Sequence, residues 1–147
     1  MKVLRFADRE FYRDWWNSNN VLDFWKTWNL PVHRWAVRHL FKPVLRAGWS
    51  VVGAQTAVFL FSAVLHEYLI SVPLRMFKAY AFLGMLFQVP LIFVTAYLEK
   101  NVGPRAGNIC VWLSLIIGQP LAIMMYYHDY VVEQYGEELI SYWGKLS

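Results

Sequence analysis

The sequence predicts an all-α, polytopic membrane protein with about three transmembrane helices, preceded by an amphipathic helical segment at the cytosolic interface. Of its 147 residues, 58% are hydrophobic and only 16% are charged, against about 25% charged residues in a typical soluble domain. Uncharged runs of 19, 20 and 22 residues cover Ala47–Leu65, Ala79–Leu98 and Ala106–Tyr127. A spanning helix needs about 20 apolar residues. The third observation is that nine of the 14 Lys and Arg residues fall within residues 1–46.

Composition excludes several other classes. A chain this apolar is not disordered, because too much apolar surface would stay in water. A single cysteine excludes a disulfide scaffold, and the four histidines lack metal-ligand spacing, so we expect no metal site. The sequence contains no nucleic-acid motif, and its net charge of +4 favours attraction to anionic lipid or phosphate over nucleic-acid binding.

Residues 1–46 form the first of two predicted parts, a cytosolic or interfacial segment. Its aromatic rings stand among charged residues, a composition suited to the headgroup level of a bilayer. It lacks the uninterrupted apolar region of a signal peptide. Its excess of Lys and Arg predicts a cytosolic position. Three crossings would then place the Arg75–Lys78 loop and the C-terminus in the lumen, and the Glu99–Arg105 loop in the cytosol.

Within this part we expect a short helix over Pro31–Arg46, since proline is tolerated in a first turn. Arg34, Arg38, Lys42 and Arg46 recur every four residues and would form one row on one face of that helix. Like charges at this spacing destabilise a helix by a few tenths of a kcal/mol per pair, so the row requires anions opposite it. Lipid headgroups are one source, and the phosphates of a nucleotide-like ligand are the other.

Residues 47–147 form the predicted membrane domain, with spans at about 47–74, 79–98 and 106–127 and a short C-terminal tail. Pro90 and Pro120 lie inside the second and third spans, closely preceded by Gln88 and Gln119. Each proline frees a backbone carbonyl and bends its helix. In lipid a neighbouring polar group must compensate, and each glutamine could do so.

His66 and Glu67 lie inside the first apolar stretch, where ionisable groups are costly and are functional candidates by default. Burial favours neutral imidazole, which can accept a proton as a general base. Adjacent residues point about 100° apart on a helix. We therefore expect His66 to face a reactive cavity and Glu67 to contact a neighbouring helix. The structural alternative is a histidine hydrogen-bonded to a backbone carbonyl or to Ser62.

Specific motifs resemble a known family. Phe11, Tyr12, Arg13, Asp14, Trp15, Trp16 and Asn17 resemble the FYxDWWN motif of the acyl-CoA acyltransferase branch of the membrane-bound O-acyltransferases. The segment around His66 resembles the one that holds the family's histidine, and Thr27-Trp28-Asn29 resembles the one that holds its asparagine. Two further segments resemble the family's diacylglycerol-using enzymes more than its sterol-using enzymes, namely residues 113–130 and the sequence HEYLISVPLRMF that begins at His66. The resemblance covers essentially the whole chain, but only the C-terminal portion of the family's length.

The resemblance implies acyl transfer from fatty acyl-CoA, a substrate rather than a cofactor, to the hydroxyl of diacylglycerol in the endoplasmic reticulum membrane, forming triacylglycerol. His66 would be the base, and Asn29 would orient His66 or the CoA arm. Gln119 would contact the acyl carbonyl, and Gln88 would line the same cavity. The FYRDWWN segment would gate the acyl-CoA entrance, with Trp15 and Trp16 packed at the interface and Asp14 paired locally. The other implied substrate-binding residues are Glu67, Trp28, His33, Arg34, Arg38 and Lys42, the last four of these meeting the CoA phosphates.

Two other functions stay open at this point. A sterol could replace diacylglycerol as the acceptor, or the chain could be a catalytically silent membrane protein that only binds lipid and acyl-CoA. Three spans are few for a tunnel with a cytosolic mouth and a lateral lipid entrance. The chain is therefore also expected to form a homo-oligomer or to lack an N-terminal part.

Overall fold

The computed structural model describes residues 9–144, with side chains described through Gly136. Lys2 and Arg5 of the predicted basic segment lie outside the described residues. The described part of the chain consists of helices and loops without a strand, which confirms the all-α class. Three helical segments, Val51–Leu74, Tyr80–Asn101 and Pro104–Gly136, are long and apolar enough to cross a membrane by length and composition.

The N-terminal part contains helices α1 (Val21–Trp28), α2 (Leu30–Ala36) and α3 (Lys42–Arg46), with α2 and α3 joined by a π-helical turn over Val37–Phe41. Asn20 and Asn29 cap α1 and α2, since each side chain accepts a hydrogen bond from a backbone N–H three residues later. Pro31 lies in the first turn of α2. The helix expected over Pro31–Arg46 is thus confirmed, with a π turn inside it.

The first span is α4 (Val51–Leu74), which begins four residues after the predicted start at residue 47. Gly48 has a positive φ of 91°, a conformation that suits glycine and ends the preceding helix. Ser50 then caps α4, as its Oγ accepts a hydrogen bond of 3.0 Å from the Gly53 N–H. The chain leaves the helix through Arg75 in the left-handed region.

The second span consists of α5 (Tyr80–Leu86) and α6 (Gln88–Asn101), and the third of α7 (Pro104–Leu113), a π turn over Ser114–Gly118, and α8 (Gln119–Gly144). Each of the irregularities at residues 37–41, 87 and 114–118 lies within about a turn before a proline, at Pro43, Pro90 and Pro120. Proline has no N–H for the helical ladder, and a π turn accommodates the lost bond. The third span, predicted to end at about Tyr127, continues in the structure as a helix to Gly144.

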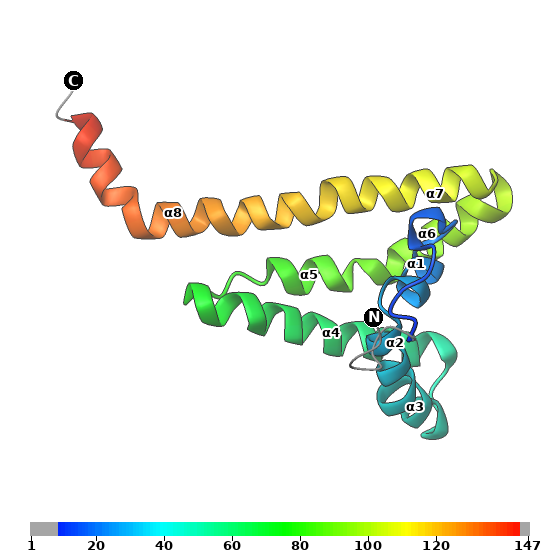
Figure 1. Cartoon of the computed structure of the whole chain (residues 1–147). Coiled ribbons are helices and arrows are strands. Elements are labelled where there is room, and N and C mark those ends of the chain that lie inside the picture. The colour runs from blue at the N-terminus through cyan, green and yellow to red at the C-terminus, as the bar shows by residue number, and fades with distance from the viewer. Residues whose placement is uncertain (1–8, 145–147) are drawn as a thin grey trace, which may run out of the picture.

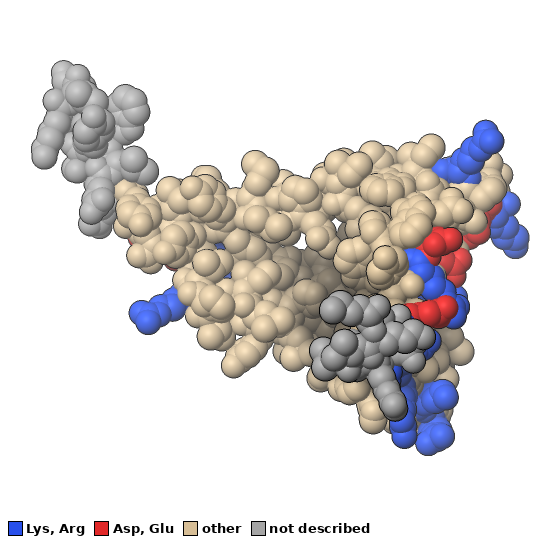
Figure 2. Space-filling view, viewed as in Figure 1, with Lys and Arg blue, Asp and Glu red and all other residues tan. Residues whose placement is uncertain are grey.

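The three spans run roughly along one direction, and the N-terminal helices lie across one end of them (Figure 1). That end also holds the start of α4 and the turn between α6 and α7. Side chains from four elements meet there in a buried cluster made of Val21, Phe24, Phe59, Ile92 and Val111. On the face shown in Figure 2, Lys and Arg gather at this end, and the middle of the spans carries none. The loop after α4 lies at the opposite end, as alternating crossings require.

Candidate functional site

His66 lies on α4, and its imidazole is exposed in this chain. Its Nδ1 lies 2.8 Å from the backbone oxygen of Ser62 and 3.3 Å from the Ser62 hydroxyl. A carbonyl oxygen can only accept, so Nδ1–H donates to it, and Nε2 keeps its lone pair in the neutral ring. The contact with Ser62 is the one that the structural alternative expects. It also fixes the tautomer in which Nε2 can take a proton.

Glu67 is 3% exposed and lies among three helices. Its carboxylate accepts hydrogen bonds from the hydroxyls of Ser71, at 2.5 Å, and Tyr126, at 2.6 Å. The backbone N–H groups of Ala79 and Phe82 donate to it at 3.1 and 3.3 Å. The expected contact with neighbouring helices is confirmed, since these donors belong to α4, to the start of α5 and to α8. The protein's own donors occupy the carboxylate, so we assign Glu67 to positioning rather than to substrate binding.

The FYRDWWN segment forms an open aromatic hollow of about 600 Å³, lined by Phe11, Tyr12, Trp15, Trp16, Trp28 and Asn29. The Trp15 ring packs edge-on to Trp28, with ring centres 4.7 Å apart, and lies 6.1 Å from Trp112. Asp14 is exposed, and its backbone oxygen accepts from the Asn17 N–H. Within residues 9–136 its side chain has no ion pair, so the local pairing expected for Asp14 is not seen.

The predicted basic row forms one side of a second hollow of about 620 Å³, lined by His33, Arg34, Val37, Arg38, His39, Lys42 and Arg46. In the part of the chain that the structure describes, none of its four cations has a carboxylate within 4.0 Å. Burial lowers the pKa of the His33 imidazole, and the nearby charges of Lys26 and Arg34 lower it further. We call this surface the basic groove.

The remaining predicted site residues lie apart from one another. Asn29 caps α2 through its Oδ1, which accepts from the Val32 N–H at 3.2 Å, and no hydrogen bond joins it to His66 among the described residues. Gln88 accepts from the Trp25 indole N–H at 3.4 Å. Gln119 is exposed at the start of α8, seven residues before Tyr126. A spacing of seven puts Gln119 on about the same face of α8 as Tyr126, whose hydroxyl contacts Glu67 of α4 and Ala81 of α5.

Comparison with known proteins decides the family. A model described as MBOAT, membrane-bound O-acyltransferase family, matches residues 2–128. The chain belongs to the membrane-bound O-acyltransferase family. It is 57% identical over 135 residues to Diacylglycerol O-acyltransferase 1 of Homo sapiens, covering 91% of this chain and 27% of that protein. The Bos taurus protein of the same name is 55% identical over 131 residues, which cover 89% of this chain and 26% of that protein. The Arabidopsis thaliana protein of that name is 50% identical over 129 residues, which cover 87% of this chain and 25% of that protein. The chain spans about a quarter of the length of these relatives.

The resemblance inferred from the FYRDWWN segment, Asn29 and His66 is therefore confirmed at the level of this family. Sequence reasoning missed the groups that hold the N-terminal segment against the spans. Asn108 and Trp112 of α7 donate to the backbone of the FYRDWWN loop, and Thr95 accepts from the Val21 N–H. These contacts join positions more than 70 residues apart. Polar side chains inside apolar spans were the only signal for them.

Proposed function

We propose that this chain carries the acyl-transfer site of an endoplasmic reticulum diacylglycerol O-acyltransferase, which moves a fatty acyl group from CoA to diacylglycerol and forms triacylglycerol. Relatives named for this activity share about half or more of its residues over nearly its whole length. The observation that carries the proposal is His66 in the first span, whose Nδ1 is bonded to Ser62 while Nε2 has no hydrogen-bond partner among the described residues.

Acyl transfer needs a base for the acceptor hydroxyl and a donor for the thioester oxygen. The Nε2 of His66 takes the hydroxyl proton as the diacylglycerol oxygen attacks the thioester carbonyl carbon. The new C–O bond forms, the C–S bond breaks, and the imidazolium returns the proton to the leaving sulfur. Gln119, a neutral donor on the helix face toward α4, supplies a hydrogen bond to the carbonyl oxygen.

The acyl-CoA thioester would enter from the end that holds both hollows. The basic groove offers four cations without carboxylate partners among the described residues, and phosphates match guanidinium and ammonium groups well. The aromatic hollow beside it offers apolar surface and the Asn29 amide. Diacylglycerol carries no phosphate and would reach His66 from the lipid side.

The test uses membranes that contain the full chain, labelled oleoyl-CoA, and either diacylglycerol or cholesterol. We expect labelled triacylglycerol and no cholesteryl ester. His66→Ala should abolish triacylglycerol synthesis with unchanged protein abundance. The control His128→Ala removes an exposed histidine in α8 of the third span and should leave triacylglycerol synthesis intact. Unchanged triacylglycerol synthesis in His66→Ala would remove His66 from catalysis, and a cholesteryl ester product would change the acceptor.

The basic groove and the aromatic hollow would also suit one alternative, a catalytically silent chain that only binds lipid and acyl-CoA. A thioether analogue of oleoyl-CoA, which cannot transfer its chain, separates the two. Saturable analogue binding without product from any acceptor indicates the silent alternative. Absence of both binding and product contradicts the proposed function.

A further inference from the structure

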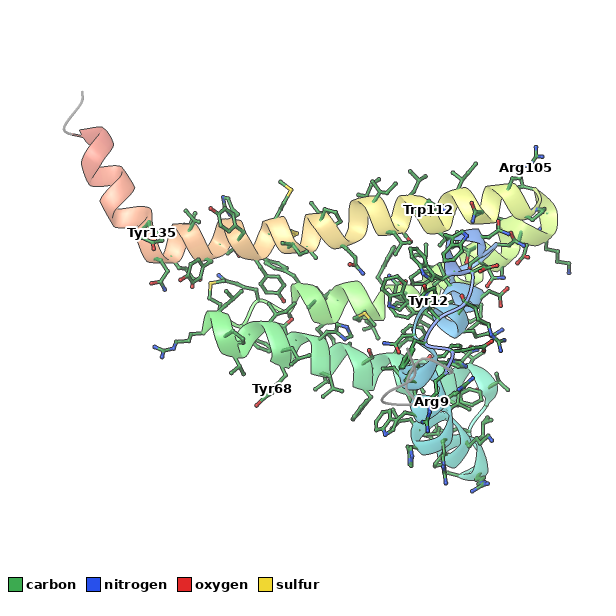
Figure 3. The ribbon with its side chains drawn as sticks, in the orientation of Figure 1. Arg9, Tyr12, Tyr68, Arg105, Trp112 and Tyr135 are labelled. Atoms are coloured by element: carbon green, nitrogen blue, oxygen red, sulfur yellow. The ribbon has the colours of Figure 1, made fainter. Side chains whose placement is uncertain are left out.

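The loop that follows the FYRDWWN motif is fastened to the third span. The Asn108 side-chain amide donates to the backbone oxygens of Trp16, at 3.2 Å, and Ser18, at 2.8 Å. The Trp112 indole N–H donates to the same Trp16 oxygen at 3.1 Å. Figure 3 shows Tyr12 of the motif and Trp112 of α7 at the same end of the molecule.

The two segments approach each other closely beside Asn108. A Cβ placed on Gly107 would lie 1.9 Å from the backbone oxygen of Asn19, so only glycine fits there without displacing the loop. Gly107 and Val111 are buried in this contact region. The N-terminal half of the third span therefore has its position set by the loop rather than by lipid.

The same span continues without a break in the chain's helical path to Gln119 and to Tyr126, whose hydroxyl donates to Glu67 at 2.6 Å. It is thus held at two points, by the motif loop near its start and by Glu67 further along. The π turn and Gln119 lie between these points, and residues 116–121 are all exposed. The position of residues 116–121 therefore depends on both contacts, the one with the motif loop and the one with Glu67.

We infer that Asn108 is a positioning residue, whose amide holds the aromatic hollow at a fixed place relative to the helix that carries Gln119. The Asn108 amide bridges two backbone oxygens that lie two residues apart in the loop, and the Trp112 indole N–H adds a third hydrogen bond, to the Trp16 oxygen. The aromatic hollow that binds acyl-CoA and the Gln119 amide that contacts the thioester carbonyl would then keep a fixed position relative to each other. This inference rests on the proposed function, but it makes a claim about acyl-CoA affinity that does not require turnover.

The experiment compares Asn108→Ala and Asn108→Asp with Asn101→Ala in the full chain in membranes. Asn101 is the matched control, since among the described residues its amide donates only to the Tyr97 oxygen of its own helix. A net protein hydrogen bond contributes about 1 kcal/mol, so we expect Asn108→Ala to weaken binding of the oleoyl-CoA thioether about fivefold. Asn108→Asp should weaken it more, because an acceptor would face two carbonyl oxygens. Asn101→Ala should bind as the unchanged chain does.

Kinetics provide the second measurement. Asn108→Ala should raise the KM for oleoyl-CoA several-fold and leave the KM for diacylglycerol unchanged. If the Asn108 variants do not accumulate, Trp112→Phe decides, because it removes the indole N–H and keeps an aromatic ring beside Trp15. The inference is overturned if Asn108→Ala binds the analogue as tightly as Asn101→Ala does. The same holds for Trp112→Phe where it replaces the Asn108 variants. Analogue binding that shifts as expected without any triacylglycerol supports it while the proposed catalysis fails.

Discussion

Asn29 serves both as the cap of α2 and as a wall of the aromatic hollow, so substituting it tests two roles at once. Asn29→Ala removes the cap, which costs about 1 kcal/mol of stability, together with the amide donor. Asn29→Asp keeps an acceptor for the Val32 N–H, removes the amide donor and adds a negative charge. If the amide orients substrate, both variants should reduce triacylglycerol synthesis, less completely than His66→Ala does. Asn29→Asp should then differ from Asn29→Ala only in a higher protein abundance. Full activity in Asn29→Asp would make the cap its whole role.

His33 lines the basic groove with a pKa held below its usual value by burial and by the charges of Lys26 and Arg34. A bound phosphate would favour the imidazolium and raise that pKa, so binding takes up a proton. The affinity for the oleoyl-CoA thioether should then rise as the pH falls from neutrality toward the pKa of the free protein. His33→Gln should flatten this dependence, except for the slope from the ligand's own phosphate, whose pKa is about 6. Equal slopes in both proteins would place the phosphates elsewhere.

At the residue scale, sequence reasoning succeeded where one side chain was anomalous for its surroundings. Glu67 stood out as a carboxyl group in an apolar run, and the structure gives it four donors. Asn108 did not stand out, because it lies near the start of a span where polar residues are ordinary. Its importance depends on where the loop at residues 16–19 lies in space. A single sequence does not contain that information.

At the element scale, the helix formed by α2, the π turn and α3 presents Arg34, Arg38 and Lys42 to one hollow. Replacing these three with Gln should raise the KM for acyl-CoA and leave the response to diacylglycerol nearly unchanged. A charge-assisted contact to phosphate contributes about 1.5–3 kcal/mol when partly desolvated. Added salt should have a similar effect, since the Debye length is about 8 Å at physiological ionic strength. An unchanged acyl-CoA KM, with weaker dependence on anionic lipid, would assign the row to headgroups.

The existence of the helices was predictable from apolar runs and periodic charges, but their ends were not. The start of α4 depends on the left-handed Gly48 and the Ser50 cap, which are local features masked by the surrounding apolar run. The prolines correctly marked irregular turns. The uncharged run ends at Tyr127, but the helix that carries it continues to Gly144. In the structure Lys78, in the loop between α4 and α5, pairs with Glu133 of α8 at 2.6 Å.

At the scale of the whole molecule, the basic N-terminal helices and the turn between α6 and α7 lie at one end, and the loop between α4 and α5 at the other. The second span joins these ends through 22 residues, or about 33 Å of helix at 1.5 Å per residue. That length matches a hydrocarbon core of about 30 Å. The excess of Lys and Arg predicts that the first end is cytosolic.

Two single-cysteine variants test this orientation in a Cys110→Ser background, which removes the chain's one cysteine. Lys100→Cys is in the last turn of α6, and Phe77→Cys is in the loop after α4, where Phe77 is 79% exposed. In sealed microsomes with their cytosolic face outward, an impermeant maleimide should label Lys100→Cys directly. Phe77→Cys should react only after detergent opens the vesicles, because its thiol would face the lumen. The reverse pattern would invert the orientation, and labelling of both in sealed vesicles would contradict a second span that crosses the membrane.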